Sequence, residues 1–186
     1  MKLNLGAHGT RIPGFSNVDL LPETAPDIIA DLLSVEFHEG SVEEIYCSHT
    51  LEHFSYVAAW YLLEKFNRWL QPGGTLWLAV PDFEKLCRIV IAGEGDSDHI
   101  RGLLYGGCHY ETDHHKSGWT RPFLRETLEA RGYEIVDEWQ PFVENEERNG
   151  SDAAGVWFEW RSGERTSLSL NWKCRKVGPS RVLTPW

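Results

Sequence analysis

The chain contains 186 residues, a length that suits one domain with a full hydrophobic core. Hydrophobic residues make up 41% of it and charged residues 25%, which is typical of a globular protein and excludes a disordered or fibrous chain. The net charge of −10 argues against a nucleic-acid partner, because nucleic-acid affinity depends mainly on neutralising phosphates.

Two short strands separated by a glycine turn begin the predicted fold. The first, Leu3 to Leu5, runs into Gly6-Ala-His-Gly9, and the second ends at Asp19. Glycine permits positive φ and leaves room for a ligand against the backbone. Ligands of open α/β sheets bind outside the carboxyl ends of the strands, where an acid can hold ribose hydroxyls, so we expect a nucleoside-containing cofactor. A tight turn without a ligand explains the glycines equally well, and the absence of Gly-x-Gly-x-x-Gly disfavours nicotinamide or flavin.

Strands and helices alternate through the middle of the chain. Apolar residues recur every three or four positions from Tyr56 to Leu70, which predicts a helix that Pro72-Gly73-Gly74 ends. Asp82 can cap a second helix, and Thr120 precedes a third that stops at Gly132. Short apolar runs predict strands at 27–31, 42–47, 75–80 and 133–139. This alternation indicates an α/β fold.

Antiparallel pairing is expected near the C-terminus. Residues 156–160 and 166–173 alternate apolar and polar side chains around a turn at 161–164, which predicts a hairpin at one sheet edge. Residues 144–151 are polar and predict a mobile surface loop. We expect a single domain that spans residues 1–186.

Targeting and redox signals are weak. No segment is apolar for long enough to span a bilayer, and the first residues show no basic and then hydrophobic leader, so we expect a cytoplasmic protein without a membrane partner. The four cysteines are scattered and form no Cys-x-x-Cys pair, which favours buried free thiols over a metal or redox site.

Several stretches resemble motifs of one enzyme family. They are Leu3 to Gly9 with Asn17-Val-Asp19, Ile29-Ala-Asp-Leu32, Glu44 to His53, Leu70 to Leu76 continuing to Asp82, and His115-Lys-Ser-Gly-Trp119. In order and spacing, residues 3–139 resemble the small class I S-adenosylmethionine-dependent methyltransferases. The resemblance implies a Rossmann-like, seven-stranded, mostly parallel sheet with an antiparallel C-terminal edge and helices on both faces. It also implies methyl transfer from S-adenosyl-L-methionine to a small-molecule acceptor.

The resemblance assigns cofactor contacts to individual residues. Asp19 would accept both ribose hydroxyls, and Asp31 with Leu32 would flank the adenine, although a turn cap explains Asp31 nearly as well. Ser48 and His49 would line the place where the sulfonium and the acceptor meet. The full set of expected cofactor contacts is Asn4, Gly6, Ala7, His8, Asp19, Leu20, Asp31, Leu32, Ser48 and His49.

The glycine turn departs from the family at two positions. Gly6, Ala7 and His8 would lie against the methionine part of the cofactor, yet His8 replaces a small residue that is common in the turn. Asn4 stands where many relatives have an acid.

Histidines supply the candidate catalytic groups. His49, and His115 in the loop 108–119, are candidates for positioning the acceptor or for general-base work, because imidazole titrates near neutral pH. Tyr110 and Trp119 can stack on the acceptor. A surface histidine cluster without a role explains the loop equally well.

Metal binding and other functions are the alternatives. Two metal hypotheses are weaker: His49 with Glu52 and His53, which share a helical spacing, and the loop set of His109, His114 and His115. We expect no metal, because Leu-Glu-His is frequent in methyltransferases that bind none. A non-catalytic binding or regulatory module with the same fold is the alternative function, and an enzyme that uses NAD or a nucleotide sugar is a third.

Overall fold

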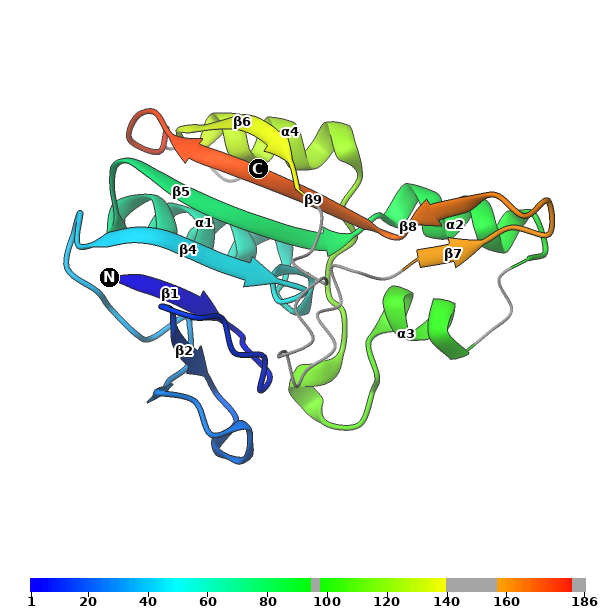
Figure 1. Ribbon diagram of the computed structural model, residues 1–186, viewed down its shortest axis with the longest axis horizontal. Helices are drawn as coiled ribbons and strands as arrows, with labels where there is room; N and C mark the ends of the chain where they lie inside the picture. The colour runs from blue at the N-terminus through cyan, green and yellow to red at the C-terminus, as the bar shows by residue number, and fades with distance from the viewer. Residues whose placement is uncertain (95–97, 140–156, 182–186) are drawn as a thin grey trace.

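A seven-stranded sheet forms the centre of the molecule (Figure 1). The computed structural model describes residues 1–94, 98–139 and 157–181. Across the sheet the strands follow the order β3 (Ile28–Ile29), β2 (Ser16–Asp19), β1 (Lys2–Leu5), β4 (Val42–Ser48), β5 (Leu70–Pro81), β9 (Ser169–Lys176) and β6 (Tyr133–Glu138). This order places the ends of β1 and β4 side by side at the point where the connections reverse direction, the usual ligand position in such sheets.

The direction of the strands confirms the predicted mostly parallel sheet and refines its edge. Neighbouring strands from β3 to β5 are parallel, whereas β9 is antiparallel to both β5 and β6. Leu78 lies opposite Trp172, and Ile135 lies opposite Cys174. β9 is therefore the antiparallel strand, and it lies between β5 and β6, both of which precede it in the chain. The edge strand itself is β6.

The two faces of the sheet are covered differently. Helices α1 (Tyr56–Trp69) and α4 (Arg121–Ala130) share one core with the side chains of β1, β4, β5 and β9 that point to the same face. On the opposite face a second cluster contains Ile12, Tyr46, Ala79 and Trp139. Among the described residues, this second cluster is built from the loop before β2 and from aromatic side chains of the strands and of Trp139.

Local signals set the helix ends. The Ser55 side chain accepts a hydrogen bond from the backbone of Ala58, and Asp82 caps α2 (Phe83–Ile91) through the backbone N–H of Lys85. Gly132 follows α4 with φ +78°, a conformation that favours glycine. The sequence did not predict α3 (Asp98–Tyr105), which is short and contains Gly102. Three 3-10 helices complete the set among the described residues: η1 (Pro22–Thr24), η2 (Leu51–His53) and η3 (Glu111–Asp113).

The predicted C-terminal hairpin is present as a separate small sheet. Strands β7 (Trp157–Glu159) and β8 (Arg165–Ser167) pair antiparallel. The expected strand at 166–173 is broken at Leu168, whose buried side chain packs with α2 and α3 instead of continuing the pleat. The predicted mobile loop at 144–151 lies outside the described residues.

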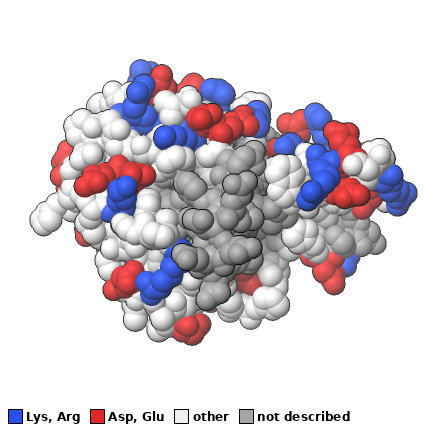
Figure 2. Space-filling view, viewed as in Figure 1, with Lys and Arg blue, Asp and Glu red and all other residues white. Residues whose placement is uncertain are grey.

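Charges of both signs alternate on the face shown in Figure 2. Ion pairs join Arg121 to Glu138 and Arg175 to Glu134. The described part of this face therefore offers no continuous basic surface of the kind that a phosphate backbone requires. Within the described ranges, no helix is long and apolar enough to cross a membrane.

Candidate ligand-binding site at the carboxyl edge of the sheet

A cavity of about 660 Å³ opens where β1, β2 and β4 end. Its volume falls within the range of about 300–1,000 Å³ that is typical of small-molecule sites. All the residues expected to contact a cofactor line it: Asn4, Gly6, Ala7, His8, Asp19, Leu20, Asp31, Leu32, Ser48 and His49. The structure thus brings the set together, and cofactor contact itself stays a prediction.

The glycine turn after β1 is shaped by a close packing contact. Gly6 has φ +64°, and a Cβ atom there would lie 2.3 Å from Oγ1 of Thr50. The backbone N–H of Gly6 donates to the carbonyl of Val18 at 2.9 Å, which joins the turn to β2. Only glycine fits this position, and the turn lines the cavity.

Asp19 at the end of β2 is held by the turn itself. Its Oδ2 accepts the backbone N–H of His8 at 2.7 Å, and its Oδ1 accepts that of Leu21 at 2.9 Å. The residue is only 6% exposed, yet it lines the cavity. Each carboxylate oxygen keeps further acceptor capacity, so the group is fixed in place and able to accept hydroxyl donors.

Asn4 stabilises the turn from inside the sheet. Its Nδ2 donates to the carbonyl of Thr10 at 2.8 Å and to Oδ1 of Asn17 at 3.1 Å. Asn17 donates to the same Thr10 carbonyl at 2.9 Å. An amide in place of the acid of many relatives therefore closes the loop by neutral hydrogen bonds.

Asp31 caps a turn and also lines the cavity. Its Oδ1 accepts the backbone N–H of Leu33 at 2.9 Å, and its Oδ2 accepts the hydroxyl of Ser34 at 3.1 Å. Leu32 beside it is buried at the cavity wall. The turn-cap interpretation is therefore correct, and it places an acid and an apolar side chain together as an adenine site requires.

His49 is a neutral side chain at the end of β4. Its Nε2 lies 2.6 Å from Oγ of Ser169, and its Nδ1 lies 3.3 Å from Oε1 of Glu52. Burial, with smaller contributions from His115 and His53, lowers the pKa of His49 to about 3. At neutral pH the ring therefore carries no charge and both nitrogens face protein groups.

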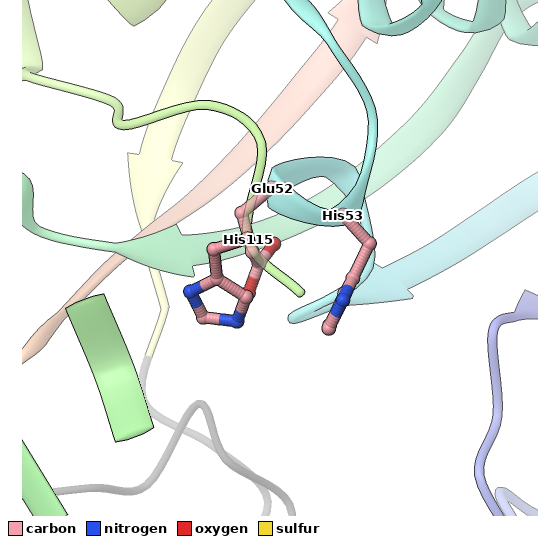
Figure 3. Close-up of side chains that lie close together, drawn as sticks. All are labelled: Glu52, His53 and His115. Atoms are coloured by element: carbon pink, nitrogen blue, oxygen red, sulfur yellow. The ribbon is translucent and has the colours of Figure 1, made fainter. Parts of the chain in front are cut away.

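A buried carboxyl group and two further histidines lie beside the cavity (Figure 3). Glu52 is 1% exposed, and burial raises its pKa to about 8. The rings of His53 and His115 meet edge to face at 4.7 Å, and the pKa of His115 is lowered to about 4, first by burial and then by His53. The cluster differs from both metal-ligand sets that the sequence suggested. It combines Glu52 and His53 from the first set with His115 from the second, while His109 and His114 are exposed.

Comparisons with known proteins agree with this geometry. Residues 17–78 match a family model described as "Methyltransferase domain", over the segment from β2 to β5. The chain has the class I methyltransferase fold. The strand order, the acid after β2 and this match together confirm the resemblance to class I S-adenosylmethionine-dependent methyltransferases.

Solved structures with the same fold come from several organisms. A chain of the Haloferax volcanii complex that contains the Trm112 methyltransferase activator is 16% identical, with a TM-score of 0.61, 95% of this chain covered and 82% of that one. The Burkholderia thailandensis 1,6-didemethyltoxoflavin-N1-methyltransferase, with bound S-adenosylhomocysteine, is 18% identical with a TM-score of 0.59. The match covers 95% of this chain and 71% of that one. A Methanosarcina mazei SAM-dependent methyltransferase is 17% identical with a TM-score of 0.59, and the match covers 95% of this chain and 92% of that one. No curated protein matches the sequence.

The remaining wall of the cavity in this methyltransferase fold comes from segments that the sequence analysis used less. The loop after α3 contributes Tyr110, as expected, together with Thr112, Asp113 and Lys116. Trp119 is fully buried and stacks on Phe123 at 5.4 Å, so its expected role in acceptor stacking is wrong. The described residues that line the cavity do not include His115.

Two lining side chains were missed although a signal was present. Thr50 lies in the same motif as Ser48-His49 and Phe54 follows that motif directly, shortly after a strand that ends at the cavity. Their position at a carboxyl strand end is the signal that would have included them.

Proposed function

We propose that this protein binds S-adenosyl-L-methionine in the cavity and transfers its methyl group to a small-molecule acceptor. The observation that carries the proposal is Asp19: a buried carboxylate at the end of β2, oriented by two backbone N–H groups and facing the same cavity as the glycine turn. The methyltransferase family match and the shared fold support the choice of cofactor.

The cavity residues fit the parts of this cofactor. Asp19 would accept the two ribose hydroxyls, and Asp31 with Leu32 would hold the adenine. Gly6 lines the cavity without a side chain, so its backbone could contact the methionine part. When bound, S-adenosylmethionine supplies a methyl group on a positively charged sulfur, and the sulfur keeps the electrons of the bond that breaks.

The acceptor would be held by the loop after α3 and by the end of β4. Tyr110, Asp113 and Lys116 line this side of the cavity. His49, with a pKa lowered to about 3 and both ring nitrogens facing protein groups, is suited to positioning rather than to proton abstraction. His115 likewise has its Nδ1 hydrogen-bonded to the carbonyl of Leu103, so general-base work by either histidine is the weaker proposal.

Calorimetric titration with S-adenosylmethionine and S-adenosylhomocysteine tests the proposal. Saturable one-to-one binding of both is expected, with no comparable binding of NAD or a nucleotide sugar. Failure to bind either S-adenosyl compound would refute the proposed function. Turnover is then measured by release of S-adenosylhomocysteine across a panel of small phenols, amines, thiols and carboxylates.

A binding or regulatory module is the second candidate function. One structural neighbour belongs to a complex with a methyltransferase activator, which favours the idea that a protein of this fold works with a protein partner. The neutral, enclosed His49 is also not suited to accept a proton from the acceptor. Tight cofactor binding without turnover on any acceptor of the panel would favour this candidate. A cytoplasmic location stays a prediction.

A further inference from the structure

Three metal-ligand side chains from two separate segments meet beside the cavity (Figure 3). Glu52 and His53 belong to η2, directly after β4, and His115 belongs to the loop that follows η3. One ligand atom from each residue can be chosen so that all three lie within 4.8 Å of one another. Neither sequence motif alone contains this arrangement, since the fold creates it.

Neither oxygen of the Glu52 carboxyl group makes a hydrogen bond to another residue that the structure describes. It is 1% exposed, and both of its oxygens are buried without a hydrogen bond, although Nδ1 of His49 lies 3.3 Å from Oε1. A buried polar group without a partner costs free energy and is therefore rare. The backbone carbonyl of Glu52, by contrast, accepts the N–H groups of Lys116 and Ser117 at 2.8 and 3.2 Å, which fixes the residue against the loop that carries His115.

Both histidines offer a ring nitrogen to a ligand, and the backbone sets the tautomer of His115. Nδ1 of His115 lies 3.0 Å from the carbonyl of Leu103; it must carry the proton to donate there, which leaves the lone pair on Nε2. Nδ1 of the His53 ring is buried and has no hydrogen-bond partner among the described residues. Each ring thus has a nitrogen available as a ligand, and in His115 the other nitrogen is held by the backbone, as is common around metal-bound histidines.

We propose that Glu52, His53 and His115 bind one Zn²⁺ ion. Two imidazoles and one carboxylate are a known ligand set for zinc, with water in the fourth position. Tetrahedral ligands at about 2.0–2.1 Å from zinc lie about 3.4 Å from one another, so ligand atoms within 4.8 Å need to approach by at most about 1.4 Å. The ion would supply the missing partner for Glu52 and join η2 to the loop after α3.

This site goes beyond methyl transfer and is independent of it. His53 lines the cavity, whereas Glu52 and His115 are not among its described lining residues, so the ion would lie at the wall of the cavity. An ion there stabilises the acceptor side of the site by holding Lys116 and its neighbours against η2. Cofactor binding through Asp19 does not require it.

Zinc titration of the full, tag-free chain tests the proposal. Protein treated with a chelator and then desalted is titrated with Zn²⁺ against a chromophoric competitor, and Co²⁺ is used in parallel because its visible spectrum reports the coordination geometry. We expect one ion per chain. We expect Glu52→Gln and His115→Ala each to lower the affinity by about 100-fold or more, since losing a ligand costs at least as much as losing its outer-shell partner.

The loop offers matched controls. His109 and His114 are exposed histidines of the same loop and lie outside the cluster, so His109→Ala and His114→Ala should change the affinity by less than about threefold. Circular dichroism of each variant checks that it is folded, and Glu52→Gln keeps the size of the buried side chain.

Three results would overturn the zinc site. They are the absence of one-to-one Zn²⁺ binding by the wild-type chain, unchanged affinity in the folded Glu52→Gln and His115→Ala variants, and an equal loss in the two control variants. A parallel titration with S-adenosylhomocysteine separates the two proposals. Cofactor binding without zinc binding refutes only the metal site, and the converse refutes only the proposed function.

Discussion

Replacing Asp19 by Asn tests the arrangement on which the proposed function rests. The carboxylate accepts one backbone N–H on each oxygen, from His8 at 2.7 Å and from Leu21 at 2.9 Å. Asparagine has the same shape but one acceptor oxygen and one N–H₂ donor. In the variant one of these backbone N–H groups therefore faces another donor inside a buried site.

The magnitudes follow from these contacts. A buried donor left without its acceptor costs about 1–3 kcal/mol, so Asp19→Asn should lower the free energy of unfolding by that amount. For a chain of this size each kcal/mol corresponds to about 2–4 °C in the melting temperature. Two ribose hydroxyls would also lose charge-assisted bonds; a loss of about 3 kcal/mol corresponds to about 100-fold weaker cofactor binding.

Calorimetric titration with S-adenosylhomocysteine measures the affinity, and thermal unfolding measures the stability. Asp98→Asn is the control, because that aspartate lies on α3 with its side chain 98% exposed, in a surface ion pair with Arg101. We expect the control to match the wild type in both assays. If Asp19→Asn remains folded and its affinity stays within threefold of the wild type, Asp19 does not hold the ribose and the reasoning fails.

Three further predictions concern the turn and the thiols. Gly6→Ala should lower the free energy of unfolding, measured by urea titration, by about 1–3 kcal/mol. The reason is that φ at this position is +64° and the added Cβ would overlap Oγ1 of Thr50. Equal stability of the variant and the wild type would contradict this packing. His8→Gly should leave the affinity for S-adenosylhomocysteine within about threefold of the wild type. The backbone N–H of His8, not its exposed side chain, holds Asp19, and the φ of +40° suits glycine. A larger fall in affinity would show that the imidazole touches the ligand. Burial raises the pKa of Cys47 to about 12, which keeps the thiol protonated below that pH. At pH 8, iodoacetamide should therefore label exposed Cys108 in the native protein, and buried Cys47 and Cys174 only after unfolding. Native labelling of Cys47, detected by peptide mass spectrometry, would refute this burial.

Short-range signals in the sequence predicted most of the elements. The apolar spacing from Tyr56 to Leu70 and the proline after it define α1, and the cap at Asp82 defines the start of α2. The predicted strands also form, because each is a short apolar run bounded by turn residues. The exact placement came only from the structure: β9 lies one position inside the edge of the sheet, and both α1 and α4 cover the same face. Long-range packing decides these features, and no local pattern records it.

The candidate site divides in the same way. The sequence by itself determined that Asp19, Asp31 and Ser48 meet at the cavity, because parallel strands bring their carboxyl ends to one edge and each of these residues lies at or just after such an end. Only the tertiary structure decided their chemical state. Burial raises the pKa of Glu52 and lowers that of His49, and the approach of the loop after α3 places His115 beside Glu52. Desolvation and contacts between distant segments exist only in the folded chain, so ionisation and metal ligation lie beyond what residue spacing can predict.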